Sequence, residues 1–170
     1  TASLQINGRS SSTSQLENEV IFQGDRLQAN YANVPGQWET VWLGESTNVN
    51  IDHLTIKNAS IGLLIQNNNG SNVSIKNTQI YNSTHYGIFA QNGKITAENL
   101  VINNAGEAAL RCVYGGNYTF SHCTFNNNWN NSSQQAVTLS NFKSGAVPET
   151  NALSKATFNN CIIYGAYSNE

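Results

Sequence analysis

Two carboxylates sit at equivalent places in a motif that recurs along the chain, and such a pair can support acid–base chemistry. Asp52 and Glu98 are two repeats apart, which in a stack of strands corresponds to roughly 9.6 Å. Glycosidases use two carboxyl groups that flank the bond they cleave. The repeat between them, however, places Lys76 at the same position. The alternating signs favour an exposed charge ladder over a catalytic pair, and each exposed pair contributes only ~0.2–1 kcal/mol.

A second group of chemically capable residues lies farther along the chain. His85, Glu107 and Arg111 fall on or beside strands that neighbour one another in the expected stack. Together they could form a catalytic cluster, but solvated turn residues are the simpler interpretation. The sequence therefore assigns no catalytic residue and leans towards a protein that is not an enzyme, without deciding the point.

No cofactor or metal is predicted, because the cysteines and histidines lack the spacing of a ligand set. Cys123 and Cys161 hold the same inward place in successive repeats, so their Cα atoms are expected about 5 Å apart. That distance permits a disulfide, but parallel side chains in register fit its dihedral angle poorly. Stacked free thiols are favoured and a disulfide is the alternative, whereas Cys112 is expected to be unpaired.

These residues are positioned by a motif of two alternating apolar residues, a two-residue polar kink, two more apolar residues and then Asn. It begins at Val49 and recurs about every 23 residues, at Val73, Ile95, Tyr118 and, after a longer interval, Ala156. Alternation of this kind is typical of strands, and repetition at this length is typical of solenoids. A third apolar pair in each unit, such as 63–65 and 88–90, predicts a third strand. We therefore predict an all-β solenoid of about six coils, each with three short strands.

Two columns of polar residues follow from stacking the repeats. The second kink position requires a tight bend, and it holds Asn and His, which are enriched in the left-handed region of backbone space. Its members are His53, Asn77, Asn99, His122 and Asn160. A second column opens the next turn and is predicted to form an amide ladder, in which each hydrogen bond contributes ~0.5–1.5 kcal/mol. Its members are Asn58, Asn82, Asn104 and Asn127.

The composition limits the partners. Only 11% of the 170 residues are charged and the net charge is −2, so no basic patch exists to bind nucleic acid. We expect one domain over 1–170, from which the loops 23–40, 126–136 and 140–155 project. Neither end shows an obvious polar cap, so a trimmed or partial chain is expected. Tyr31, Trp38 and Trp129 on these loops could stack on sugar rings, although packing within the loops is the simpler interpretation.

Five segments of the chain are distinctive, namely residues 22–27, 34–38, 56–62, 122–125 and 160–165. Together they resemble right-handed parallel β-helix repeat lipoproteins of Bacteroidota. The resemblance extends over nearly the whole chain and implies a right-handed parallel β-helix. It also implies export to the cell surface, with attachment to the outer membrane through a lipid-bearing cysteine outside this chain. It implies no established reaction and no catalytic residues.

The outward residues of the third strand suggest a docking face. Trp42, Leu64, Phe89 and Arg111 occupy this position in successive coils. Contiguous exposed apolar residues usually mark an interface, and Trp and Arg are common anchors, but the loop 23–40 is long enough to cover them. We expect a non-catalytic cell-surface β-helix that binds or scaffolds an envelope protein. The alternative is a β-helix that binds or degrades a surface polysaccharide.

Overall fold

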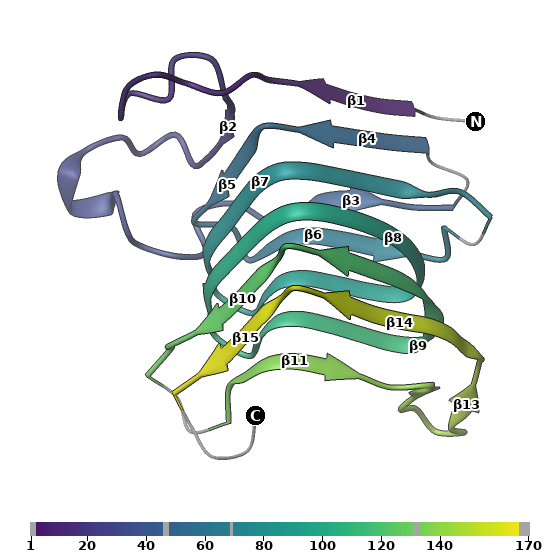
Figure 1. Ribbon diagram of the computed structural model, residues 1–170. Helices are drawn as coiled ribbons and strands as arrows, with labels where there is room; N and C mark the ends of the chain where they lie inside the picture. The colour runs from purple at the N-terminus through teal and green to yellow at the C-terminus, as the bar shows by residue number, and fades with distance from the viewer. Residues whose placement is uncertain (1–2, 46–47, 69, 131–132, 167–170) are drawn as a thin grey trace.

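Every coil of the chain turns its alternating apolar residues towards a common axis and its polar residues outwards, and the coils stack as a parallel β-helix (Figure 1). The computed structural model describes residues 3–45, 48–68, 70–130 and 133–166. Neighbouring coils are joined by parallel strand pairs in register. The predicted all-β solenoid is therefore confirmed, and within the described residues one short 3-10 helix, η1 (Ala29–Tyr31), is the only helical element.

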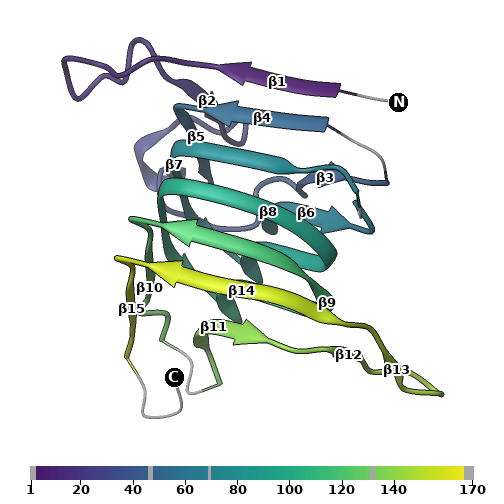
Figure 2. The same cartoon turned by 45° about the vertical axis from the view of Figure 1, so that its right-hand side comes forward.

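The strands form three columns, and the longer ones bend through a corner and contribute to two or three of them (Figure 2). The first column contains β1 (Ser3–Asn7), β4 (Asn48–Asp52), parts of β7 (Val73–Ser83), β8 (Tyr86–Ala105) and β9 (Ala108–Ser121), and β14 (Leu153–Asn159). The second contains β2 (Val20–Phe22), β5 (Leu54–Lys57), parts of β7 and β8, β10 (Thr124–Asn127) and β15 (Ile162–Gly165). The third contains β3 (Val41–Leu43), β6 (Ile61–Gln66), the starts of β8 and β9, and β11 (Gln135–Leu139).

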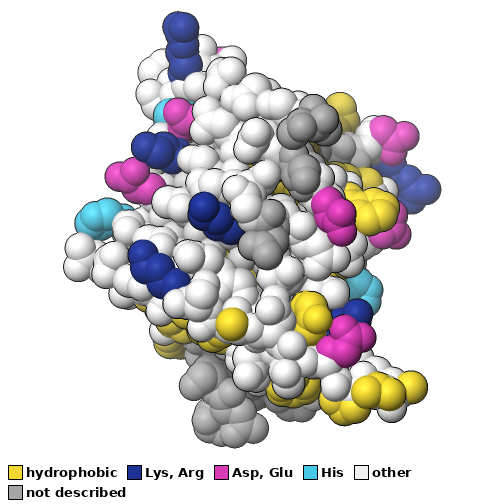
Figure 3. All heavy atoms as spheres, turned by 90° about the vertical axis from the view of Figure 1, so that its right-hand side faces the viewer, with side chains coloured by type: hydrophobic (Ala, Val, Ile, Leu, Met, Phe, Trp, Pro, Cys, Tyr) yellow, Lys and Arg dark blue, Asp and Glu magenta, His cyan; other side chains and the backbone are white. Residues whose placement is uncertain are grey.

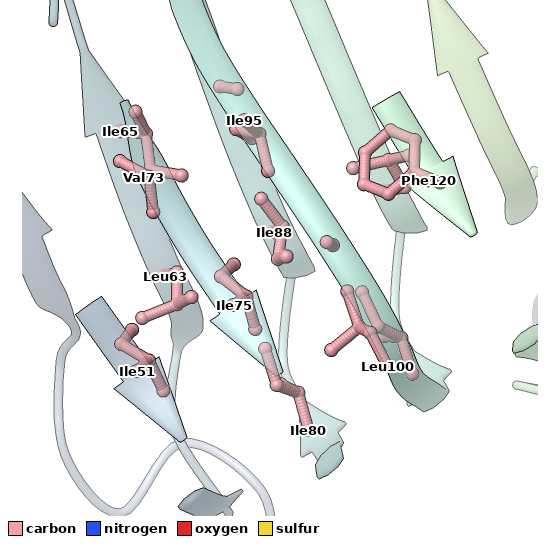
Figure 4. Close-up of a cluster of buried hydrophobic side chains, with 14 of the residues drawn as sticks. Ile51, Leu63, Ile65, Val73, Ile75, Ile80, Ile88, Ile95, Leu100 and Phe120 are labelled. Atoms are coloured by element: carbon pink, nitrogen blue, oxygen red, sulfur yellow. The ribbon is translucent and has the colours of Figure 1, made fainter. Parts of the chain in front are cut away.

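Like residues stack on like residues inside the helix, as the repeat predicts. In the second column Ile56 pairs with Ile80, Ile80 with Ile102, and Ile102 with Phe125. All four are fully buried, and the other two columns contribute similar ladders of Ile, Leu and Val (Figure 4). Ile163 continues this column beside Phe125 but is 48% exposed. Burial of a whole aliphatic side chain contributes about 1.5–3 kcal/mol, so these ladders supply most of the stabilisation.

The corner between the first and second strands has the predicted left-handed backbone. The φ angles of His53, Asn77, Asn99, His122 and Asn160 are 52°, 48°, 53°, 55° and 52°. The amide ladder also runs along this corner, because Asn77 donates to Asp52 Oδ1 at 2.8 Å and Asn99 donates to Asn77 Oδ1 at 2.8 Å.

The ladder predicted for the second polar column is largely wrong. Within the described residues, its members share one side-chain hydrogen bond, from Asn82 to Asn58, at a long 3.5 Å. The amides bond to backbone groups instead, as when Asn58 donates to the Ala32 carbonyl and Asn127 accepts from the Ala105 N–H. Asn58, Asn82 and Asn104 also have positive φ, so this column serves a second tight corner.

The projecting segments differ in part from the sequence-based expectation. The segment 140–155 contains an antiparallel hairpin of β12 (Phe142–Lys143) and β13 (Glu149–Thr150), and its last residues belong to β14. Residues 126–127 belong to β10 and residues 135–136 to β11, so that loop is shorter than predicted. A further loop, residues 8–19, separates β1 from β2 and is absent from the predicted set.

The corner geometry gives a stability prediction. Asn99→Ala should unfold at a lower urea concentration than Asn99→Gly, by an amount equivalent to about 1–2 kcal/mol, because a left-handed conformation costs a Cβ-bearing residue that much. Both variants lose the hydrogen bond to Asn77, so the difference between their free energies of unfolding reports the cost of the left-handed backbone alone.

The matched control is Asn50, an exposed residue within β4 that is not among the residues with positive φ. At this position the order of stability should reverse, so that Asn50→Gly unfolds at a lower urea concentration than Asn50→Ala. The same order at both positions would show that the corner does not impose the left-handed conformation.

Candidate functional site

The outward residues of the third column form one continuous strip, which we term the third-column face. Strand pairing places Trp42 beside Leu64, Leu64 beside Phe89, Phe89 beside Arg111, and Arg111 beside Thr138. They point outwards because their strand neighbours, such as Leu63 and Ile65, are buried. Aromatic and aliphatic side chains on three adjacent coils thus lead to an arginine on the fourth.

The chain's own loops leave this face partly open. Trp42 is 67% exposed, whereas Leu64, Phe89 and Arg111 are partly buried. The loop 23–40 projects from another side of the solenoid, at the left in Figure 1, where it carries η1. In Figure 3 most of the visible surface is uncharged and polar, and hydrophobic atoms lie mainly towards the right-hand and lower parts of the view.

The loop aromatics do not converge on one site. Trp38 packs against the core, forms a bridge with Ala59, and donates from Nε1 to the Lys57 carbonyl at 2.9 Å. Tyr31 lies in the same loop, with the Arg26 guanidinium 5.1 Å from its ring centre. These contacts support the simpler interpretation of both residues, which is packing within the loop.

Trp129 lies farther along the solenoid. Its ring covers Gly106, where an added Cβ would approach Cε2 to 3.6 Å. The Gly106 N–H donates to the Ser83 carbonyl, and the Thr84 N–H donates to the Ala59 carbonyl. Gly106 is therefore two coils beyond Ala59. The three aromatics therefore present no shared platform for a sugar chain.

A polar cluster borders the third-column face, and it includes a residue that the sequence did not single out. His85 Nδ1 lies 2.7 Å from Glu107 Oε1, and the Tyr86 hydroxyl donates to Glu107 Oε2. The Tyr86 ring stacks on Phe89 with 5.1 Å between ring centres, and the Arg111 guanidinium lies 5.7 Å from the Tyr86 ring centre. The proximity of His85, Glu107 and Arg111 that the sequence suggested is thus real, and Tyr86 is the residue that links them.

The surroundings of Glu107 and Tyr86 move the pKa values of both groups away from neutrality. Partial burial raises the pKa of Glu107, but hydrogen bonds from Tyr86 and His85 and the positive charge of Arg111 outweigh burial and hold that pKa below its ordinary value. Burial and the hydrogen bond to Glu107 raise the pKa of Tyr86 to about 12. A general acid or base works best with a pKa near the working pH. At neutral pH Glu107 is therefore an ionised acceptor and Tyr86 a neutral donor.

Asp52 and Glu98, the other carboxylates that the sequence suggested for acid–base chemistry, lie on either side of Lys76. Strand pairing places Lys76 between Asp52 and Glu98, and the Lys76 Nζ lies 3.4 Å from Glu98 Oε2. The Asp52 carboxylate instead contacts His53 Nδ1 at 2.8 Å and accepts a hydrogen bond from Asn77. Among the described residues the predicted charge ladder is therefore present only as the pair of Lys76 and Glu98. Within the described ranges, no group of three or more His, Cys, Asp and Glu side chains is placed to hold a metal ion.

The three cysteines are free thiols, as the sequence favoured. Cys112 and Cys123 are buried, and Cys161 is partly buried. Burial raises the pKa of the Cys123 thiol to about 11. Neither buried thiol is therefore disposed to act as a nucleophile at neutral pH.

Comparison with known proteins identifies the family. A model of the right-handed β-helix region matches residues 38–169. The chain belongs to the right-handed β-helix family. This assignment fits the three columns and the inward ladders, and it gives the predicted hand of the solenoid.

A search of curated proteins and a search of solved structures each gave no significant match. In the part of the chain that the structure describes, no helix is long and apolar enough to cross a membrane.

The cluster gives a pH prediction. Tyr86→Phe removes a hydrogen bond to ionised Glu107, so the pKa of Glu107 should rise, and carbon NMR of its carboxyl group measures the change. Because a lowered pKa in the folded state stabilises the fold above the unfolded pKa, this stabilisation is lost as the pH falls through the folded pKa. The free energy of unfolding should therefore depend less on pH in Tyr86→Phe than in the unchanged chain, between pH about 4.5 and the lowered pKa of Glu107 in the folded state.

Tyr81→Phe is the matched control, because Tyr81 is a partly buried tyrosine on the second column with no carboxylate among the causes of its raised pKa. It should leave the Glu107 titration unchanged. An unchanged Glu107 pKa in Tyr86→Phe would show that the hydroxyl does not hold the carboxylate.

Proposed function

We propose that this β-helix is a non-catalytic binding or scaffold protein of the cell surface, and that its third-column face docks a protein partner. The observation that carries the proposal is the uninterrupted strip from Trp42 through Leu64 and Phe89 to Arg111, with the Trp42 indole 67% exposed. Trp42 is mostly exposed, and the partly buried Leu64 and Phe89 extend the apolar surface from it; contiguous apolar surface of this kind often marks an interface. Trp and Arg are also the residues most often found as anchors of protein interfaces.

The outward residues of the first column provide an internal comparison. In that column Asn50 pairs with Ser74, Ser74 with Thr96, and Thr96 with Thr119. The same fold thus builds a uniformly polar outward column where water is the neighbour. The apolar strip is therefore a local property of the third column and not a consequence of the solenoid architecture.

The absence of a catalytic role is supported by the chemistry of the best-formed cluster. Glu107 is held ionised, Tyr86 is held neutral, and the pair Asp52 and Glu98 is separated by Lys76. A carboxylate, an imidazole and a tyrosine hydroxyl beside an aromatic face are well suited to forming hydrogen bonds with a partner. The cluster therefore serves as the polar border of the docking face.

Two further elements of the proposal come from the sequence. The resemblance to Bacteroidota β-helix lipoproteins supports a place at the outer membrane, with a lipid anchor outside this chain. The low charge content and many Asn, Ser and Thr residues suit an extracellular solenoid. On this basis the partner is a protein of the cell envelope.

A surface polysaccharide is the second candidate ligand, and one observation favours it. Tyr86 and Phe89 form a stacked aromatic pair next to Glu107 and His85, which combines an apolar platform with hydrogen-bonding groups. Sugar rings present an apolar face and a rim of hydroxyl groups, so this combination also fits a glycan.

The docking proposal predicts a crosslink from one face only. A photo-crosslinking residue placed at Trp42 in the native cell envelope should give one discrete adduct. The same residue at Thr96, an exposed position on the polar first column, should give none. The adducts are measured by electrophoresis and mass spectrometry.

The nature of the adduct separates the two candidates. Mass spectra of the digested adduct that contain peptides of a second protein support the protein partner, whereas a loss of adduct mass on glycosidase treatment, without such peptides, supports the polysaccharide. Equal crosslinking from Trp42 and Thr96, or none from Trp42, would refute docking at this face. Trp42→Asp should keep the melting temperature and eliminate the complex, because Trp42 is mostly solvated in the isolated chain.

A final expectation concerns activity. The purified chain should release no oligosaccharides from common polysaccharides, as measured by reducing ends and by unsaturated products. Release that is lost in Glu107→Gln, Asp52→Asn or Glu98→Gln would overturn the non-catalytic assignment. Glu149→Gln is the control carboxylate, because Glu149 lies on the exposed hairpin β12–β13.

A further inference from the structure

The hairpin β12–β13 projects beyond β11 at one end of the solenoid (Figure 2). A groove is lined by residues of this hairpin and of the third-column face. Its volume is about 420 Å³, which is within the range of sites for small organic ligands. Phe89, Val113, Leu139 and Phe142 supply its apolar wall. Uncharged polar side chains complete the lining together with two cations, Arg111 and Lys143.

The two cations are available to a ligand. Within the described residues neither Arg111 nor Lys143 takes part in an ion pair, and neither is involved in a side-chain hydrogen bond. Their close contacts are with aromatic rings, since Arg111 lies over Tyr86 and the Lys143 ammonium lies 5.8 Å from the ring centre of Tyr114. Their hydrogen-bond donors are therefore unused.

Two carboxylates neighbour these cations along the chain or across the hairpin. Glu107 accepts from Tyr86 and contacts His85. Glu149 pairs with Lys143 across the hairpin backbone, and its carboxylate raises the pKa of Tyr114. No carboxylate lines the groove, so its charged lining is entirely positive.

The base of the hairpin is fixed to the solenoid, which holds the rim of the groove in place. The Ser140 N–H donates to the Cys112 carbonyl at 2.9 Å, and the Phe142 N–H donates to Ser140 Oγ at 3.1 Å. On the returning strand the Asn151 N–H donates to the Asn141 carbonyl at 2.8 Å. Phe142 and Lys143 therefore start from an anchored position and need little ordering when a ligand binds.

We propose that this groove binds a small amphipathic anion, namely a flat or extended apolar body that carries one carboxylate or sulfonate group. The apolar body lies against Phe89, Leu139 and Phe142, and the anionic group accepts hydrogen bonds from Arg111 and Lys143. Binding of this kind does not require the partner that docks at Trp42, although the two sites share Phe89 and Arg111.

The test uses a pair of fluorescent probes that differ in charge. 8-Anilinonaphthalene-1-sulfonate has two ring systems and a sulfonate, and N-phenyl-1-naphthylamine has the same rings without the sulfonate. All measurements use the full chain with Trp42→Ser, so that the exposed indole does not bind the probes. Lys143→Gln and Arg111→Gln should each weaken binding of the sulfonate roughly tenfold, the effect of losing one charged hydrogen bond. Affinity for the neutral probe should not change.

Two further variants locate the site. Phe142→Ala should weaken both probes, because it removes part of the apolar wall. Lys155→Gln should weaken neither, because Lys155 is an exposed cation on β14 and does not line the groove. Unchanged sulfonate affinity in both cation variants, or unchanged affinity of both probes in Phe142→Ala, would overturn the proposal. Circular dichroism and melting confirm that each variant is folded.

Competition then identifies the natural chemistry of the apolar body. Displacement of the sulfonate probe by dodecanoate assigns the body to an extended acyl chain, and displacement by 2-naphthoate assigns it to a flat ring system. Either result supports the proposal, whereas displacement by neither at millimolar concentration contradicts it. Because Trp42→Ser removes partner docking but retains the groove, failure of one proposal is distinguishable from failure of the other.

Discussion

The geometry of the solenoid depends on one residue in each coil after the first, which bends the chain through positive φ between the first and second strands. A two-residue kink allows the strands on both sides to remain parallel to those of the neighbouring coil, and it does so only if its second residue is left-handed. Asn and His tolerate this conformation better than other residues with a Cβ. Asn also stacks by side-chain hydrogen bonds, as from Asn99 to Asn77. A constant corner keeps the register constant, and a constant register creates the buried ladders.

The same regularity gathers outward apolar residues in one place. Because strand alternation sends every second residue outwards, an outward position is repeated in each coil, and a run of apolar residues there becomes a continuous strip. The third column has such a run from Trp42 to Phe89, whereas the first column has Asn, Ser and Thr. The polar cluster around Glu107 and the cationic groove near Lys143 lie next to that strip, so the groups best suited to binding are on one side of the solenoid.

The architecture was predictable from the sequence because it is encoded locally and repeated. Five corner residues and the ladder Ile56, Ile80 and Ile102 occupy the positions that the repeat assigns. The role of Tyr86 was not predictable, since its bond to Glu107 joins residues one coil apart and depends on side-chain direction at the end of a strand. The preference of Asn58 for the Ala32 carbonyl over a neighbouring amide likewise depends on a loop whose path carries no periodic signal. The hairpin β12–β13 interrupts the repeat, and its two short strands are exposed throughout, so no alternation marks them.

Parallel pairing between consecutive coils also has a consequence for how the chain folds. Most strand pairs, such as Val49 with Val73 and Ile95 with Tyr118, join residues separated by about one coil of sequence. Loop-closure entropy is therefore similar at each step and does not grow with the number of coils. Folding can begin at any coil with a good apolar ladder and extend one coil at a time. The first and last steps are exceptions. The pairing of β1 with β4 closes over the loop 8–19, β2 and β3, and the pairing of β9 with β14 closes over β10, β11 and the hairpin. Leu4 and Val49 are farther apart in sequence than Tyr118 and Ala156, so the entropic cost is largest at the first of these steps.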